Sequence, residues 1–270
     1  MKLTYLGTAA AEGFPAVFCR CKYCIEARRL GGKNVRTRSQ SMINGDMLID
    51  FGPDTYMHLL TRGIEGDAIK YLLVTHPHED HFYLLELFNR ASPYAHEMRA
   101  PTLTVVCGAD TRAMVEGQPK NVEFKIISAY ETVTVGEYEI TALPARHMRE
   151  GNTPLFYLIK GDKTLLYAHD TGYFFDEVFD FLVENKIRVH AISLDCTYVT
   201  NIVGDTDGHM GLENNARLLA RLRELGIVDG ETVCYVNHFS HNGNPLHERI
   251  VPIARELGFE VSYDGCEVEF

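Results

Sequence analysis

The stretch from Thr75 to His81 reads Thr-His-Pro-His-Glu-Asp-His and follows a short apolar run. Such a run of β-forming residues predicts a buried strand, so the histidines leave its carboxyl end. Side chains two residues apart in an extended segment point the same way, and His76 and His78 can therefore bind one metal ion. Asp80 and His81 follow at the start of an expected helix and face a neighbouring position. This geometry indicates two metal ions rather than one.

Three further candidate ligands, His147, Asp170 and His238, stand just past other expected strands. Imidazole nitrogens and carboxylate oxygens suit Zn, Mn or Fe, and these ligand types do not select among the three metals. Water shared by two such cations loses a proton near neutral pH and becomes a nucleophile. The chemistry that these residues indicate is hydrolysis.

The order His-x-His-x-Asp-His resembles the motif of the metallo-β-lactamase superfamily, whose other ligands lie far along the chain. The resemblance spans nearly the whole chain and implies an α/β fold, a four-layer αββα sandwich. It implies two divalent metal ions in the active site, the first bound by His76, His78 and His147, the second by Asp80, His81 and His238, and both bridged by Asp170. His169 is adjacent to Asp170, but alternation along the chain should turn it away.

Three cysteines, Cys19, Cys21 and Cys24, lie in one short loop and supply three soft ligands, one short of a tetrahedral zinc site. Their spacing is similar to that of the phosphoribosyl cyclic phosphodiesterases of the carbon–phosphorus lyase pathway, a branch of the superfamily. In that branch a histidine three residues after the last active-site ligand completes a structural zinc site, which implies His241 here. The four other cysteines are expected in the core: Cys107, Cys196, Cys234 and Cys266.

A general acid is needed if the substrate is a phosphodiester, because the leaving oxygen takes up a proton, and histidine suits this role at neutral pH. His209 precedes an expected helix and is not needed as a ligand. The related phosphodiesterases carry a non-ligand histidine at this place, which implies that His209 is the acid and acts together with Asp170. Asp195 ends an expected strand and is a candidate for orienting a ligand histidine.

Five basic residues fall within the segment 28–38 of an acidic chain: Arg28, Arg29, Lys33, Arg36 and Arg38. A solvated loop is one interpretation of this segment, and a patch that steers a phosphate to the site is the other.

Other residues near the motif bear on the substrate. Arg146 and Arg149 flank His147 and are candidates for contact with a substrate phosphate. Many relatives have glycine a few residues after the last histidine of the motif. This chain has Phe82 and Tyr83 there, which we expect to narrow or line the entrance.

Composition limits the classes of function. With 270 residues the chain can bury a substantial core, and we expect one domain over residues 1–270, with a zinc-binding loop at 19–24. A net charge of −11 argues against broad capture of nucleic acid. No apolar run approaches the roughly 20 residues that span a membrane, and the start lacks the apolar stretch of a signal peptide. We therefore expect a cytoplasmic protein. The resemblance implies a small, phosphorylated substrate. A homodimer is left open.

Strands and helices alternate along the chain without a repeat or linker. Helices are expected at Asp54–Thr61, His81–Asn89, Ala109–Glu116, Asp176–Asn185, Leu212–Leu225 and Pro245–Leu257. The strands expected between them include Lys2–Leu6, Met47–Asp50, Tyr71–Thr75, Glu139–Leu143, Thr164–Ala168, His190–Asp195 and Thr232–Val236. This pattern fits two sheets packed face to face under helical layers.

The first hypothesis is a dinuclear metal-dependent phosphodiesterase acting on a small or cyclic phosphodiester, with a metal-bridging hydroxide as nucleophile and His209 as acid. The second is a hydrolase of a lactone, thioester or amide that uses the same metal centre. The third is a non-hydrolytic binding protein like the pyrroloquinoline-quinone biosynthesis proteins, which resemble this branch.

Overall fold

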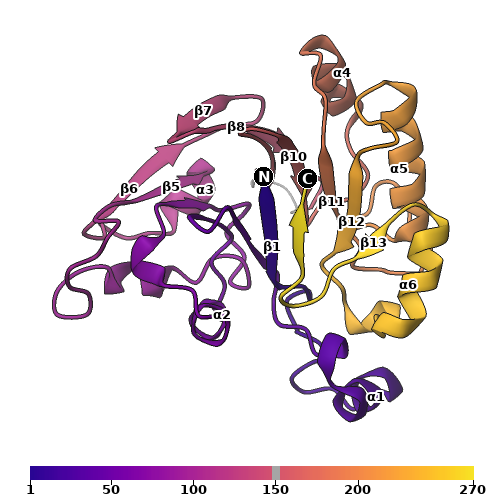
Figure 1. Ribbon diagram of the computed structural model, residues 1–270, viewed down its shortest axis with the longest axis horizontal. Helices are drawn as coiled ribbons and strands as arrows, with labels where there is room; N and C mark the ends of the chain where they lie inside the picture. The colour runs from indigo at the N-terminus through magenta and orange to yellow at the C-terminus, as the bar shows by residue number, and fades with distance from the viewer. Residues whose placement is uncertain (148–152) are drawn as a thin grey trace.

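Two mixed β-sheets of seven strands each pack face to face between layers of helices (Figure 1), in a computed structural model that describes residues 1–147 and 153–270. The first sheet has the order β14-β1-β2-β3-β4-β5-β6. Its strands are β1 (Lys2–Gly7), β2 (Gln40–Ile43), β3 (Met47–Ile49), β4 (Tyr71–Leu73), β5 (Leu103–Cys107), β6 (Val122–Ile126) and β14 (Glu267–Glu269). The expected four-layer α/β sandwich is confirmed.

The second sheet has the order β13-β12-β11-β10-β9-β8-β7. Its strands are β7 (Thr132–Val135), β8 (Tyr138–Pro144), β9 (Leu155–Lys160), β10 (Thr164–Ala168), β11 (Ala191–Asp195), β12 (Val233–Asn237) and β13 (Glu260–Val261). Strands β3 to β6 run parallel to one another, as do β10 to β13. The carboxyl ends of parallel strands meet at one edge of a sheet, and ligand sites in such sheets form there.

Helices cover the outer side of each sheet (Figure 1). The second sheet carries α4 (Asp176–Glu184), α5 (Leu212–Glu224) and α6 (His247–Glu256), and the first carries α2 (Thr55–Arg62) and α3 (Ala109–Ala113). Helix α1 (Lys22–Leu30) projects from one end of the molecule. Short 3-10 turns η1 (Gly32–Asn34), η2 (Gly66–Ala68), η3 (Leu84–Asn89) and η4 (His241–Gly243) complete the elements. None of the helices in the described part of the chain is both long and apolar enough to cross a membrane.

The core between the sheets follows from the alternation of side chains along each strand. Ile159 of β9 and Leu165 of β10 face the first sheet, whereas their neighbours Leu158 and Leu166 pack under the helices. Tyr157 crosses between the sheets, and its hydroxyl donates to the carbonyl of Val74 at 2.6 Å. Val74 directly precedes the histidine motif, so the core fixes the point from which the motif departs.

The expected helix His81–Asn89 was wrong. Phe51 N donates to His81 O at 2.6 Å, and Tyr83 N donates to Phe51 O at 2.7 Å, so the chain is held extended past β3. A backbone held in this way cannot begin a helix, and only the 3-10 turn η3 follows. Helix α1 was not anticipated, because the segment was interpreted as a zinc-binding loop followed by a basic segment.

Removing side-chain volume from the inter-sheet core should destabilise the fold in proportion to burial. We expect Ile159→Ala to lower the free energy of unfolding by about 2–5 kcal/mol, because Ile159 is fully buried. Ile126→Ala is the matched control, since Ile126 also lies in a strand but is 44% exposed, and it should lower stability by less than about 1 kcal/mol. Urea unfolding of both variants measures the difference, and equal losses would contradict this account of the core.

Candidate metal centre

The first group of candidate ligands gathers where β4 and β8 end. His76 Nε2 lies 2.9 Å from His78 Nδ1, and His147 Nε2 lies 3.2 Å from the same nitrogen. Pro77 separates the two motif histidines, and the rings of His76 and His147 meet edge-on at 4.8 Å. Three imidazole nitrogens therefore converge on one point, although 69 residues separate His78 from His147.

A second group lies beside the first. Ligand atoms of Asp80, His81 and His238 all lie within 4.8 Å of one another. Asp170 stands between the groups: its Oδ2 is 2.6 Å from His81 Nε2 and 3.0 Å from His238 Nε2. Its Oδ1 is 3.7 Å from His147 Nε2. One carboxylate thus presents a separate oxygen to each group, which is the arrangement that a bridging ligand requires.

The residues around Asp170 Oδ2 fit a divalent cation, as three buried polar atoms of the second group indicate. Within the part of the chain that the structure describes, His81 Nε2, His238 Nε2 and Asp170 Oδ2 are buried without a hydrogen-bond partner. Buried polar atoms are rarely left unsatisfied, and each one that is needs an explanation such as an ion. A divalent cation among these atoms would satisfy all three.

The electrostatic field of the site also favours cations. Burial lowers the pKa of His81, but Asp170, Asp50 and Asp80 outweigh it and raise that pKa well above its usual value. Burial lowers the pKa of His76 well below its usual value, so this imidazole is neutral, the form that binds a metal. The carboxylates that would hold a proton on His81 would equally hold a cation.

Neighbouring groups orient the imidazole rings through Nδ1. His147 Nδ1 lies 3.2 Å from the carbonyl of Gly208, and His238 Nδ1 lies 2.8 Å from Thr197 Oγ1. A donor proton on Nδ1 leaves the lone pair of Nε2 for a metal, which is the usual outer-sphere support of a histidine ligand. His76 has the same kind of partner as His238, because its Nδ1 faces the hydroxyl of the preceding threonine at 3.0 Å.

Asp50 is a functional residue that the sequence reasoning missed. It is fully buried, its Oδ2 lies 2.7 Å from His81 Nδ1, and its Oδ1 accepts from the backbone and hydroxyl of Thr75 at 2.9 Å each. Asp50 therefore orients a candidate ligand and fixes the start of the motif. Its position at the end of an expected strand, on the ligand side, was the signal that could have revealed it.

Further hydrogen bonds connect Asp50 to the end of the chain. Gln40 Nε2 donates to the Asp50 carbonyl at 2.9 Å, and Gln40 Oε1 lies 2.6 Å from His58 Nδ1. His58 Nε2 lies 2.7 Å from Thr37 Oγ1, which is 2.6 Å from Asp264 Oδ2. This buried series joins β2, α2 and the segment before β14 to the backbone beneath His81.

Three residues of the site have left-handed backbone conformations: Asp50 at φ 64°, Asp170 at φ 49° and His238 at φ 64°. Such values are uncommon for residues other than glycine, although aspartate, asparagine and histidine adopt them more readily. Local strain of this kind persists where surrounding structure enforces it, often at functional sites. Here each value occurs where a strand ends and its side chain turns into the cluster.

Asp195 contacts His209 more closely than any candidate ligand. Its Oδ2 lies 2.9 Å from His209 Nδ1 but 3.6 Å from His238 Nδ1. The expectation that Asp195 orients a ligand histidine therefore has less support than a role in orienting His209. Burial lowers the pKa of His209, but Asp195 and Asp170 outweigh it and raise the pKa to about 9. His209 Nδ1 lies 3.6 Å from Asp170 Oδ1, so the structure brings this histidine to the cluster.

His169 turns away from the cluster, in line with the alternation of side chains. Its Nε2 lies 2.6 Å from Ser193 Oγ, and its Nδ1 lies 3.2 Å from Asn237 Nδ2. His169 is fully buried and serves as a hydrogen-bonded core residue.

The cysteine loop and the expected fourth ligand lie together. Cys21 Sγ and Cys24 Sγ are 3.7 Å and 3.6 Å from His241 Nδ1, and Cys19 completes the group. Burial raises the pKa of Cys21, but hydrogen bonds with His241 and its loop neighbours lower it to about 6, toward the thiolate that binds zinc. The four sulfur and nitrogen atoms fit a tetrahedral zinc ion. The other four cysteines are buried, as expected.

The basic segment 28–38 is neither a solvated loop nor a continuous patch. Arg36 is almost fully buried, where it donates to Thr8 Oγ1 and Ser262 O, and Arg28 donates to the carbonyls of Ala16, Cys19 and Cys24. Arg38 pairs with Asp54 at 3.0 Å. Arg38 also lines an opening of about 670 Å³ together with His78 and Asp80, so it is the member of the segment that reaches the site.

Four further residues were expected near the substrate or at the entrance: Arg146, Arg149, Phe82 and Tyr83. Arg146 Nε donates to the Tyr173 carbonyl, and its guanidinium lies 4.0 Å over the ring of Phe175. Arg149 lies outside the described residues. Phe82 is 2% exposed and packs in the core under the first sheet, so the expectation that it lines the entrance was wrong. Tyr83 is 38% exposed.

Comparisons with known proteins agree with this architecture. The family described as "Beta-lactamase superfamily domain" matches residues 46–233. The crystal structure of a diphosphatase from the PhnP family is similar over 100% of this chain and 97% of its own, with a TM-score of 0.75 and 20% identity. Zinc-bound PqqB from Methylobacterium extorquens is similar over 100% of both chains, with a TM-score of 0.76 and 18% identity. YhfI from Bacillus subtilis is similar over 100% of this chain and 99% of its own, with a TM-score of 0.71 and 17% identity. No curated protein matches the chain.

A side chain at position 52 should disrupt the cluster. A Cβ atom on Gly52 would lie 2.0 Å from the carbonyl oxygen of Asp80, so the metal-bearing loop must move. We expect Gly52→Ala to lose at least half of the metal bound at the cluster. Its free energy of unfolding should fall by about 1–3 kcal/mol. The control is Gly230→Ala, since nothing lies within 4 Å of a Cβ there. Metal analysis and urea unfolding measure both effects, and full metal content in Gly52→Ala would contradict the close approach.

Removing one thiol should empty only the cysteine site. We expect Cys21→Ser to lose about one zinc ion per chain and to keep the metal at the histidine–aspartate cluster, because the two groups share no ligand. The control is Cys234→Ser, which alters a buried cysteine outside both groups and should keep all metal. Elemental analysis of the purified variants makes the measurement. Unchanged zinc in Cys21→Ser would rule out the assignment.

Proposed function

The chain belongs to the metallo-β-lactamase superfamily, and from this we propose that it is a dinuclear metal-dependent phosphodiesterase acting on a small or cyclic phosphodiester. The observation that carries the proposal is the position of Asp170 between two groups of ligands, with His209 and Asp195 beside it. The first ion would be held by His76, His78 and His147 and the second by Asp80, His81 and His238, with Asp170 bridging the pair.

The protein's own groups divide the work. When bound, the two cations would supply a water that is deprotonated near neutral pH and would offset the charge that develops on the phosphoryl oxygens. Asp50 keeps His81 in place, and Thr197 and Gly208 keep His238 and His147 in place. These contacts hold the ligands so that little reorganisation is needed during the reaction.

His209 is suited to protonate the leaving oxygen. Asp195 and Thr197 hold its Nδ1 at 2.9 Å and 3.1 Å, so Nε2 is the atom that can deliver a proton. Against the effect of burial, the carboxylate of Asp195 raises the pKa of His209, which favours the protonated imidazole that a general acid requires. Asp195 is negatively charged and stabilises the imidazolium before the transfer.

The related structures support this proposal at the level of reaction class. A diphosphatase of the PhnP family and the short form of human tRNase Z share the fold, and both names refer to cleavage of phosphate esters or anhydrides. Arg38 lines the opening beside His78 and Asp80, where its guanidinium also pairs with Asp54. A small substrate matches an opening of this kind better than a long nucleic acid.

A second candidate is hydrolysis of a lactone, thioester or amide by the same centre. The ligand cluster would serve either bond, but such leaving groups depend less on a proton from His209. The third candidate is a non-hydrolytic binding protein, favoured by the similarity to PqqB. A complete set of ligands around Asp170 argues against it, because a protein that only binds has no need of a nucleophile-generating pair.

The test is turnover of phosphodiesters by metal-loaded protein. We expect Asp170→Ala to lose bound metal and essentially all activity. The control is Asp229→Ala, which alters an exposed aspartate that is not a candidate ligand and should keep both the metal and the activity. His209→Ala should keep its metal and lose roughly 10²–10⁴-fold in kcat with an alkyl leaving group. The loss should be much smaller with p-nitrophenolate, which leaves without a proton. Equal losses for both substrates would contradict the role of His209, and turnover of carbonyl substrates alone would favour the second candidate.

A further inference from the structure

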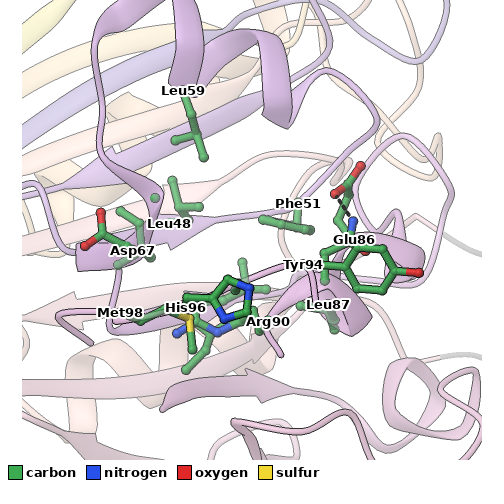
Figure 2. Close-up of a pocket in the computed structure, with 16 residues that line it drawn as sticks. Leu48, Phe51, Leu59, Asp67, Glu86, Leu87, Arg90, Tyr94, His96 and Met98 are labelled. Carbon is green, nitrogen blue, oxygen red and sulfur yellow. Dashed lines mark hydrogen bonds between the residues drawn. The ribbon is translucent and has the colours of Figure 1, made fainter. Parts of the chain in front are cut away.

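A second cavity lies on the outer side of the first sheet, among α2, η2 and η3 (Figure 2). Its volume is about 370 Å³, within the range of pockets that bind small organic molecules. Apolar side chains form most of its wall: Leu48, Phe51, Leu59, Leu72, Leu87 and Leu103. None of the candidate metal ligands lines it, so this cavity is separate from the metal centre.

One cation stands in this apolar wall. Arg90 lines the cavity (Figure 2), and its Nη2 donates to the Ala100 carbonyl at 2.7 Å. Its Nε is buried and has no hydrogen-bond partner among residues 1–147 and 153–270, and burial lowers the pKa of its guanidinium. Burying a charge in apolar surroundings is costly unless an opposite charge accompanies it.

Each carboxylate of the wall has a hydrogen-bond partner other than Arg90: a guanidinium for Asp67 and a neutral amide for Glu86. Asp67 accepts from Arg99 Nε at 2.6 Å and from Arg99 Nη2 at 2.7 Å. Glu86 accepts from Asn89 Nδ2 at 2.8 Å. Among the described residues no carboxylate forms an ion pair with Arg90, although Asp67 lies near enough to raise the pKa of its guanidinium against the effect of burial.

We propose that this cavity binds an amphipathic carboxylate, with the acid group on Arg90 and an apolar chain or ring against the leucines. A guanidinium binds a carboxylate through two parallel hydrogen bonds. A ligand with an ammonium or a neutral group in place of the carboxylate would not match this geometry. The volume suits a molecule of on the order of ten to fourteen heavy atoms. An apolar molecule without a charge would fill the void but leave Arg90 uncompensated, and a free small anion would leave the leucines exposed to water.

The experiment titrates octanoate into ¹⁵N-labelled protein and compares it with octanamide, which has the same shape without the charge. We expect saturable shifts of amides around the cavity, with octanoate binding at least about tenfold more tightly than octanamide. In Arg90→Gln this preference should vanish. Arg112→Gln is the matched control, since Arg112 is a nearby guanidinium that stacks on Phe124 and does not line the cavity, and it should keep the preference.

Two further variants keep the proposal falsifiable if Arg90→Gln does not fold. Leu59→Trp should fill the cavity and abolish binding while the metal centre keeps its ions. Asp170→Ala should bind octanoate as the unaltered protein does, so a failure of the proposed enzymatic function would not affect this result. No saturable binding, equal affinity for the acid and the amide, or shifts confined to the metal centre would each overturn the proposal.

Discussion

A single buried carboxylate, that of Asp170, sets the organisation of this protein. Its two oxygens face different groups of histidines, and within the described residues the two nitrogens nearest to Oδ2 have no hydrogen-bond partner. Polar atoms of this kind are unfavourable inside a protein unless something of opposite charge is present. The rest of the site can be understood as support for this arrangement, including the left-handed backbone at Asp170 that turns the carboxylate off the end of β10.

The two sheets supply that support from opposite sides. Asp50 belongs to the first sheet and fixes His81, whereas Asp195 belongs to the second and fixes His209. Each is fully buried and each also accepts hydrogen bonds from backbone amides, so neither can move independently of its sheet. Because the ligands come from both sheets, the face-to-face packing itself determines the spacing of the two groups. The cysteine loop meets the segment that follows β12, since His241 follows His238 by three residues.

Much of this arrangement could be predicted from the sequence, because ligands at strand ends are a local consequence of alternation and strand order. His147, Asp170 and His238 each follow a strand, and the structure gathers them without exception. Features that depend on distant contacts could not be predicted. The helix expected from His81 fails because the backbone pairs with Phe51. Arg36 reads as a surface charge, but the hydroxyl and carbonyl that hold it lie at opposite ends of the chain. The pairing of the cysteines with His241 came from family resemblance alone.

The central claim is that Asp170 bridges two cations, and anomalous X-ray scattering at the absorption edge of the bound metal tests it most directly. Two peaks are expected about 3.5–4 Å apart, on either side of the Asp170 carboxylate. One should lie near His76, His78 and His147, and the other near Asp80, His81 and His238. A third peak should lie among the three cysteines and His241. A single peak at the histidine–aspartate cluster, or two peaks that Asp170 does not contact, would contradict it.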